Sequence, residues 1–318
     1  MVAAVETMAY NKREVPWHGM GVPVTDDLTP EQMLQAASLD WKVELVPNFA
    51  TYKGKKIKVE TSTLFRETDG KILSARCSDD WNPVQNQEAA EFFNDFCAAG
   101  DMKMETAGSL CGGELVWFLA KMNESFDVFK NRDQIDAFTL FTNPHRYGWS
   151  TSVSLTATRV VCMNTLNLSL STTKGDKIVK VSHRNEFNAD EVKEVLGVTK
   201  DKMKKYKEMS QHLAKKKAKG EDIVTYFKRI FPVITSKVDG SRKELSKPAQ
   251  VAMGVLQSQP GADIAPGTWW NTYNATTYYL DHLAGRTVDA RITSAWYGDA
   301  RKRKIKAMEV ALEMADAS

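Results

Sequence analysis

Arg159 and Asn164 are the first residues to consider for chemistry, because they flank the apolar part of TATRVVCMNTL, residues 156–166. An isolated charge is costly to bury, so Arg159 needs a carboxylate, strand carbonyls or an external anion as its partner. In a structural interpretation, Arg159 binds within the fold and Asn164 caps a helix over TLNLSL. In a functional interpretation, Arg159 binds phosphate, and Asn164 binds phosphate or a base. Both interpretations stay open from the residues alone.

A loop of basic and aromatic residues precedes this stretch, in TNPHRYGWS at residues 142–150. It places Arg146 and Trp149 among proline and glycine, which are typical of turns. An arginine beside rings on a loop suits phosphate contact combined with base stacking. The alternative is an ordinary hairpin loop whose aromatic side chains fold back onto the core.

Lysines dominate residues 198–219, where nine of them accompany only two acidic residues, Asp201 and Glu208. At 100° per residue, residues 199–220 predict a helix that ends at Gly220 and has a lysine face opposite an apolar face formed by Met203, Tyr206, Met209 and Leu213. Such an excess of lysine suits a surface that follows a phosphate backbone. The lysines that we expect to contact phosphate are Lys204, Lys215 and Lys216.

Two further stretches combine polar residues with predicted helices. RKRK, residues 301–304, stands at a helix start, where the helix dipole disfavours cations, so it needs an external anion or an acidic neighbour within the protein. Residues 268–285 predict a helix with an apolar stripe and a polar stripe, the latter comprising Asn271, Asn274, Tyr278, Asp281 and His282. We interpret the polar stripe as a buried hydrogen-bond network rather than a site.

Familiar catalytic motifs are absent from the chain. It has no GxxxxGK[ST], GxGxxG, HExxH or GxSxG, and its four cysteines and five histidines show no metal-ligand spacing. Cys162 would act as a nucleophile only beside a base such as His145 or His183, and we expect buried thiols instead. We therefore expect no metal and no cofactor, and whether the protein is an enzyme stays open, leaning against.

The periodicity of the chain changes near residue 188. Before it, alternating segments predict strands, with a hairpin turn at Asp69–Gly70 and helices over 29–39 and 86–100. The predicted strands lie within residues 40–49, 55–78, 102–122, 134–143, 148–162 and 177–184. The sequence thus predicts an α+β fold: a mostly antiparallel β-sheet with packed helices in residues 1–187, then a helical C-terminal region in residues 188–318. The first helix of that region is predicted over NADEVKEVLGV, residues 188–198.

Charge is divided unevenly along the 318 residues. Residues 1–150 hold 15 basic and 22 acidic residues, whereas residues 151–318 hold 28 and 18. The basic half indicates an anionic partner, nucleic acid being the commonest, although a solvated basic surface is the alternative. No apolar run reaches the length of a membrane span and no secretory signal is visible, so we expect a cytoplasmic protein with no membrane partner.

Six stretches occur in an order that resembles a known family. They are VPWHGMGVPV, AASLDWKVE, NPVQNQEAAEFF, TAGSLCGGELVWFLAK, TRVVCMNTL and GTWWNTYNATTYYLDHLAG. Together they resemble the phage/plasmid-like proteins that carry domain of unknown function 932. In the turn at residues 142–150, Asn143 and His145 match the family pattern, whereas Pro144, Arg146 and Tyr147 depart from it. The resemblance implies a setting in phage or plasmid DNA metabolism and, by analogy, a likeness to annealing proteins that hold single strands in rings.

Three functions follow from these observations. The first is a protein that binds single-stranded DNA, and possible annealing in recombination or replication needs no nucleotide hydrolysis. Its contact residues would be Arg146, Trp149, Arg159, Asn164, Lys204, Lys215 and Lys216. The second is a metal-dependent nuclease or nucleotide-modifying enzyme. The third is an interaction protein that counters host defence through its acidic half. Unpaired strand edges make a homo-oligomer possible.

The first function predicts binding that depends strongly on salt. Because lysines and arginines displace counterions from phosphates, affinity should fall steeply from low to moderate salt. A gel-shift series with single- and double-stranded oligonucleotides at three salt concentrations measures this. Binding that is indifferent to salt, or no binding, contradicts it.

Overall fold

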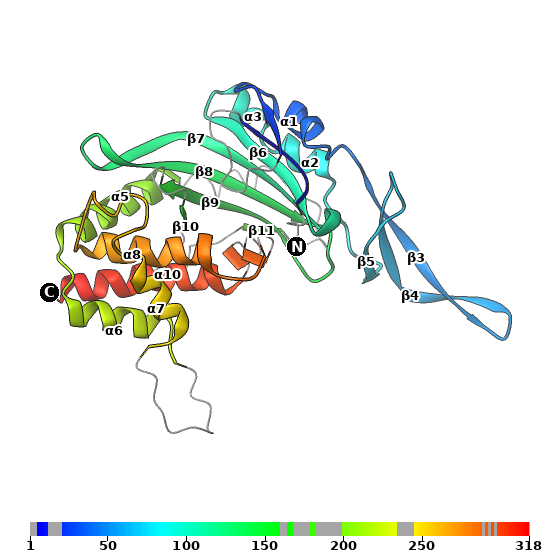
Figure 1. The fold of residues 1–318 in the computed structure, drawn as a ribbon. Helices are drawn as coiled ribbons and strands as arrows, with labels where there is room; N and C mark the ends of the chain where they lie inside the picture. Colours follow the sequence, from blue (N-terminus) through cyan, green and yellow to red (C-terminus); the bar gives the residue numbers. More distant parts are fainter. Residues whose placement is uncertain are drawn as a thin grey trace, which may run out of the picture.

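The computed structural model has an α+β fold, as the sequence predicts (Figure 1). It describes residues 5–11, 21–159, 164–167, 179–181, 199–233, 245–287, 290–291, 294–295 and 298–317. Figure 1 shows a large curved sheet with the C-terminal helices at one end, and with three short helices and a projecting three-stranded arm at the other. Within the described residues, no helix is both long and apolar enough to span a bilayer.

The large sheet contains eight described strands, nearly all antiparallel. Its order is β10-β9-β8-β7-β6-β1-β2, with β11 also pairing with β9, and only β1 and β2 run parallel. The strands are β1 (Val5–Asn11), β2 (Val22–Val24), β6 (Met102–Leu110), β7 (Leu115–Phe129), β8 (Arg132–Pro144), β9 (Thr151–Arg159), β10 (Asn164–Asn167) and β11 (Val179–Val181). A short 3₁₀ turn, Cys111–Gly113, joins β6 to β7.

Helices cover one face of this sheet in two separate groups. The first group is α1 (Pro30–Ala36), α2 (Asn86–Glu91) and α3 (Asn94–Ala98). The second group is α5 (Thr199–Lys215), α6 (Gly220–Ile230), α7 (Lys247–Gly254), α8 (Trp269–Tyr278) with a π-helical turn (Tyr279–Leu283), and α10 (Asp299–Asp316). Each group encloses its own apolar core against the strands.

Strand β8 shows that both cores lie on the same side of the sheet. Ile135 and Ala137 belong to the core under the C-terminal helices, and Phe141 belongs to the core under α1–α3. Because β8 pairs with β9 without a bulge and side chains alternate along a strand, these odd-numbered residues share one face. Met122 of β7 packs against both cores and marks where they meet. The strands' length therefore separates the two helix groups.

The arm is a second sheet in the order β3-β4-β5, built from β3 (Val43–Tyr52), β4 (Lys55–Arg66) and β5 (Ile72–Cys77). It extends away from the body of the protein (Figure 1). Its tip is a two-residue turn in which Lys53 and Gly54 both have positive φ, 47° and 76°. This backbone suits a tight β-hairpin, and glycine adopts it without strain.

Arg66 fastens the base of the arm to the main sheet. Its side chain is buried, and its Nη1 lies 2.9 Å from Oε2 of Glu6 on β1, while its Nη2 lies 2.5 Å from Oδ2 of Asp69. The guanidinium also lies over the ring of Trp41, 5.3 Å from its centroid. The hydrogen bond from Arg66 lowers the pKa of Asp69 to about 2. The stabilisation from this pair is thus complete above the usual carboxyl pKa and is lost as pH falls through about 2.

Several local predictions are confirmed. Helix α1 begins after Thr29, whose Oγ1 accepts a hydrogen bond from the backbone N of Gln32, and Pro30 is its first residue. The turn at Asp69–Gly70 joins β4 to β5. The helix predicted over 86–100 is instead two short helices, α2 and α3, interrupted at Phe92 and Phe93.

Two predictions about helix ends are wrong. Residues 164–167 form strand β10 rather than a helix, because β9 supplies their backbone hydrogen-bond partners, so Asn164 caps no helix at this point. Helix α5 ends at Lys215, and Gly220 begins α6 instead of ending α5. The helix predicted at the start of the C-terminal region, NADEVKEVLGV, lies outside the described residues, and the predicted domain boundary near residue 188 stays a prediction.

A buried ion pair joins two of the C-terminal helical segments. The Nζ of Lys304 on α10 lies 2.6 Å from Oδ1 of Asp281 in the π-helical turn, and the Lys304 side chain has no exposed surface. Of the two alternatives for RKRK, an external anion or an acidic neighbour within the protein, the second holds for Lys304. The same region holds the predicted polar network, in which Asn274 donates to the carbonyl of Trp270 and Trp270 donates to Asp133.

Breaking the buried pair should destabilise the protein strongly. Asp281→Asn leaves the Lys304 ammonium buried without its carboxylate, and we expect a loss of about 3–5 kcal/mol in the free energy of unfolding. The double variant Asp281→Leu, Lys304→Met should recover most of this loss. Urea unfolding followed by tryptophan fluorescence measures both. Lys302→Met, a change at an exposed neighbour, is the control, and an equal effect of Asp281→Asn and Lys302→Met contradicts the prediction.

Removing Arg66 should loosen the arm without unfolding the body. We expect Arg66→Met to lower the local protection of β4 and β5 by about 1.5–3 kcal/mol, because it removes hydrogen bonds to two carboxylates. Hydrogen exchange followed by mass spectrometry compares peptides from the arm with peptides from β7 and β8. Lys71→Met changes an exposed cation on the same turn and serves as the control. Unchanged exchange of the arm in Arg66→Met would refute the anchor.

Candidate nucleic-acid interface

The solvent face of α5 carries lysines, as the sequence predicts. Met203, Tyr206 and Leu213 are buried against the core, whereas Lys204 and Lys215 are exposed. Lys207 lies on the same face between them, at helical spacing. At 1.5 Å per residue, Lys204 and Lys215 stand about 17 Å apart along the axis. The helix is held in place by Tyr206 against Phe126 of β7, with ring centroids 6.2 Å apart.

The end of α5 turns sharply and is fixed against α8. The backbone N of Trp269 donates to the carbonyl of Lys216 at 3.0 Å, and Lys217 forms an isolated β-bridge with Thr268. Lys216 is half-buried, while Lys215, Lys217 and Lys219 are exposed. Lys216, one of the predicted phosphate contacts, is therefore less accessible to a ligand than Lys215. The exposed Lys217 and Lys219 extend the basic surface instead.

The loop at residues 142–150 divides into a buried part and an exposed part. Asn143 donates to the carbonyl of Val84 at 2.8 Å, and the Nε2 of His145 lies 2.9 Å from Oδ1 of Asn86. Asn143 and His145 have no exposed surface. Asn143 and His145, the two residues that match the family pattern, therefore join the end of β8 to α2 and to the residues before it, which is a structural role. Cys162, the proposed partner of His145, lies outside the described residues.

The outer part of the loop contains Arg146 and Tyr147, which are exposed, and Trp149, which is half-buried. The Arg146 guanidinium lies 5.4 Å from the Trp149 ring centroid, and its only ion pair among the described residues is a long one, 3.9 Å, to Glu114. The backbone N of Tyr147 donates to Oγ of Ser74 on β5 at 3.1 Å. The predicted contacts Arg146 and Trp149 thus lie together, beside the base of the arm.

Arg159 and Asn164 lie at the other end of strand β9. They are direct partners in the antiparallel pairing of β9 and β10, and their side chains are outside the described part of the structure. Strand β9 runs from Thr151 to Arg159, so at 3.3 Å per residue roughly 25 Å separates Arg159 from the loop at residues 142–150. The predicted contact residues therefore fall into two groups. Arg146 and Trp149 lie by the arm, and the others lie toward the C-terminal helices.

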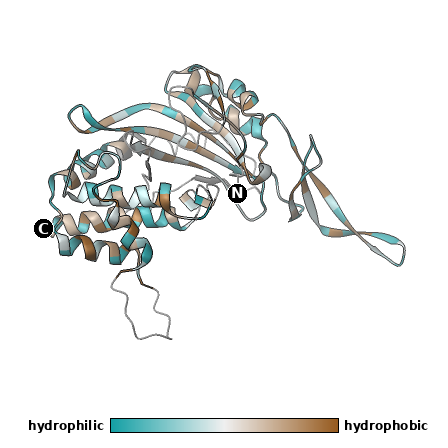
Figure 2. Ribbon diagram, viewed as in Figure 1, coloured by the Kyte–Doolittle hydropathy of each residue, from teal (hydrophilic) through white to brown (hydrophobic). Residues whose placement is uncertain are grey.

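The tip of the arm is a basic and aromatic surface that the sequence analysis missed. Residues 49–59, FATYKGKKIKV, contain four lysines and no acidic residue, and every one of them is exposed. Phe49 and Tyr52 expose 49% and 62% of their surfaces, which is unusual for large rings. Figure 2 shows hydrophilic and hydrophobic residues interspersed along the arm.

Each face of the arm tip combines a ring with lysine. The register pairs Phe49 with Lys58 and Tyr52 with Lys55, so each ring shares a face with its partner. The Nζ of Lys56 lies 4.3 Å from the centroid of the Phe49 ring, on the first face. The Nζ of Lys53 lies 5.3 Å from the Tyr52 centroid. Positive charge and aromatic surface therefore stand within a few ångströms of each other on both sides.

A sequence signal for the arm tip exists. The dipeptide Lys53-Gly54 separates two stretches rich in β-branched and aromatic residues, and lysines are interspersed with apolar residues in the second, which together are typical of a short hairpin. The net charge of residues 1–150 does not reveal this signal, because the acidic residues elsewhere in that half of the chain outweigh the four clustered lysines.

The RKRK cluster is not part of this basic surface. Besides the buried Lys304, Arg303 donates to the carbonyl of Ile230 at 2.8 Å, and burial lowers the pKa of Arg301. Of the four residues, Lys302 alone is classed as exposed. The cluster is directed mainly into the helical part of the protein.

The two other hypotheses stay predictions. Within the described residues, no group of three or more His, Cys, Asp or Glu side chains could hold a metal ion. Acidic residues do gather around a groove of about 460 Å³ between α1 and α2, where Glu31, Asp40, Glu88 and Glu91 stand with one lysine, Lys42.

Comparisons with known proteins assign the chain to a family without a described activity. A search of curated proteins and a search of solved structures each found no match. A family model described as "Domain of unknown function (DUF932)" matches residues 74–304, more than two thirds of the chain. The matched residues include β6–β9, the loop with Arg146 and Trp149, and helices α5–α8, whereas the arm tip precedes them. The protein is therefore a member of the DUF932 family, as the order of its motifs predicts.

Proposed function

We propose that this protein binds single-stranded nucleic acid, with DNA as the preferred ligand, and that the arm is its main contact surface. The observation that carries the proposal is the composition of the arm tip, where exposed rings and lysines lie side by side. Among the described residues, Lys58 pairs with Asp79 at 3.4 Å, whereas no ion pair includes Lys53, Lys55 or Lys56. Single-strand binding needs the same two components, cations for the phosphates and flat rings for unpaired bases.

The geometry of the tip favours a single strand over a duplex. Phe49 and Tyr52 can stack only on bases whose faces are accessible, and a duplex hides those faces in its own stack. Lys56 beside Phe49 and Lys55 beside Tyr52 would then neutralise the phosphates that flank the stacked bases. Lys58, also beside Phe49, would exchange its ion pair with Asp79 for a phosphate. Stacking of this kind is tolerant of sequence, because every base has a flat face.

The loop at residues 146–149 extends this surface toward the main sheet. The hydrogen bond between Tyr147 and Ser74 ties the loop to β5, and Arg146 and Trp149 repeat the combination of cation and ring. The lysine face of α5 is at the opposite end of the sheet, so a strand that contacts both surfaces must run along the sheet. Binding at two separated surfaces is compatible with annealing, which brings two strands together without nucleotide hydrolysis.

Neutralising the lysines of the arm tests the proposal. In the variant Lys53→Gln, Lys55→Gln, Lys56→Gln, Lys58→Gln, loss of four phosphate contacts should reduce the slope of log affinity against log salt by about 3. Tyr52→Ala should lower affinity by roughly tenfold and leave that slope unchanged, because stacking releases no counterions. Fluorescence anisotropy with labelled oligothymidine at several salt concentrations measures both quantities.

A second set of four lysines provides the matched control. Lys130→Gln, Lys228→Gln, Lys302→Gln, Lys306→Gln changes the net charge by the same amount at exposed positions away from the arm. We expect the control variant to keep more than half of the wild-type slope of log affinity against log salt. Equal loss of affinity in the two quadruple variants, or tighter binding of a duplex than of a single strand, would refute the role of the arm.

A further inference from the structure

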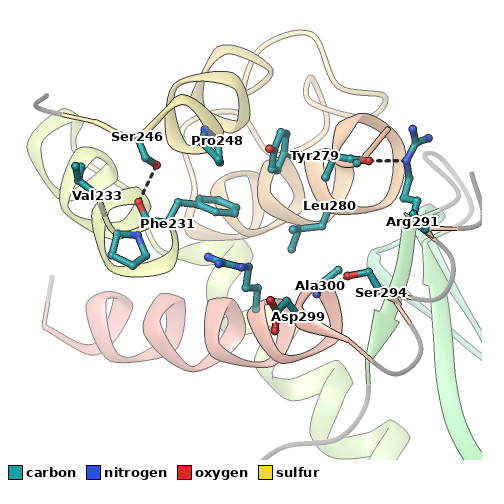
Figure 3. Close-up of a pocket in the computed structure, with 15 residues that line it drawn as sticks. Phe231, Val233, Ser246, Pro248, Tyr279, Leu280, Arg291, Ser294, Asp299 and Ala300 are labelled. Carbon is teal, nitrogen blue, oxygen red and sulfur yellow. Dashed lines mark hydrogen bonds between the residues drawn. The ribbon is translucent and has the colours of Figure 1, made fainter. Parts of the chain in front are cut away.

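A cavity of about 550 Å³ lies among the C-terminal helices (Figure 3). Figure 1 shows these helices at the opposite end of the sheet from the arm. It opens between the end of α6, the start of α7, the π-helical turn and the start of α10. Pockets of about 300–1,000 Å³ are typical of small-molecule sites. The proposed binding of nucleic acid by the arm makes no use of this cavity.

The walls of the cavity are largely apolar and include two aromatic rings. Phe231 and Tyr279 meet edge to face with centroids 5.4 Å apart, and Pro248 and Leu280 continue the same wall. Figure 3 shows Phe231 and Leu280 facing the start of α10, where Asp299 and Ala300 lie. Such a wall suits a flat or branched apolar group.

Arg303 supplies a positive charge that has no carboxylate partner in the described structure. It lines the cavity from α10, its Nη1 donates to the carbonyl of Ile230, and its guanidinium lies 5.5 Å from the Phe231 centroid. None of the ion pairs among the described residues includes Arg303. By contrast, Arg229, which also joins α6 to α10, pairs with Glu313 at 2.6 Å. One hydrogen bond leaves most of the five N–H groups of the Arg303 guanidinium available to an anion.

Two other groups refine the chemistry of the ligand. The hydroxyl of Tyr279 makes no hydrogen bond to the described residues, and burial raises the pKa of this phenol, so it stays a neutral donor. Asp299, one turn before Arg303 on α10, also lines the cavity. Its carboxylate would repel a second negative charge on a ligand. The cavity therefore offers the Arg303 guanidinium, the Tyr279 hydroxyl and an aromatic wall. Arg291 also lines it, but its Nε already donates to the carbonyl of Ala284 at 2.7 Å.

We propose that this cavity binds a small aromatic molecule with a single negative charge, such as an aromatic carboxylate. The ring packs against Phe231, Tyr279 and Leu280, and the anionic group binds the guanidinium of Arg303. The site is independent of the proposed nucleic-acid binding, so either proposal can fail without the other.

Calorimetric titration of the full chain with three probes tests the chemistry of the site. Indole-3-acetate carries the ring and one charge, indole-3-acetamide carries the ring without the charge, and deoxythymidine monophosphate carries a ring and a phosphate. We expect indole-3-acetate to bind at least tenfold more tightly than the amide. Tighter binding of the nucleotide than of indole-3-acetate would overturn the preference for a single charge, and no saturable binding of indole-3-acetate would overturn the site.

Variants locate the binding in the cavity. Arg303→Met keeps the aliphatic stem and removes the charge, and should weaken indole-3-acetate binding at least tenfold. Lys302→Met, the matched control at the preceding exposed position, should leave it unchanged. Val233→Trp fills the edge of the cavity without altering Arg303, and it should also weaken binding. This variant keeps the site testable when Arg303→Met does not fold. Wild-type affinity in Val233→Trp, or equal effects of the two charge variants, contradicts the assignment. Oligonucleotide binding should be the same in Val233→Trp as in the wild type.

Discussion

One face of the long strands β7, β8 and β9 has to accommodate two groups of helices, and the rest of the architecture depends on this constraint. The two apolar cores meet at Met122 and divide the face between them. Because a β-strand advances about 3.3 Å per residue, the length of these strands sets the distance between the groups. The arm and the loop with Arg146 consequently lie at one end of the sheet, and the lysine face of α5 and the cavity with Arg303 belong to the other.

The environment of each cation, more than its place in a basic run, decides what it can do. Lys302 and Lys304 are two residues apart, yet Lys302 is exposed and Lys304 is enclosed in an ion pair with Asp281. Arg66 is likewise buried and holds the arm to Glu6. At the arm tip, Lys53, Lys55 and Lys56 are exposed and make no ion pair with the described residues, so they retain their hydration and can meet a polyanion, whereas Lys58 pairs with Asp79. Desolvation thus separates structural cations from those available to a ligand.

Lysines on an exposed hairpin have a second physical role, because they discourage edge strands from pairing with other chains. That role explains the charge at the arm tip but not its rings. Phe49 and Tyr52 would promote association if protection of the edge were the only purpose. Their exposure beside lysines is better explained by a ligand that has both charge and flat apolar surfaces, which is why the arm, rather than α5, is central to the proposed function.

Several features can be predicted from the residues alone, because local backbone preferences and side-chain periodicity are present in short segments. They are the fold class, the turn at Asp69–Gly70, the cap at Thr29, the amphipathic α5 and the family. The sequence by itself could not determine that residues 164–167 form a strand, since their hydrogen-bond partners come from β9, nor that Lys304 is buried, since Asp281 lies 23 residues away. The grouping of Arg146 and Trp149 with the arm, and their separation from Arg159, were decided only by the tertiary structure. The physical reason is that spatial proximity across a sheet depends on strand order and register, which no single segment encodes.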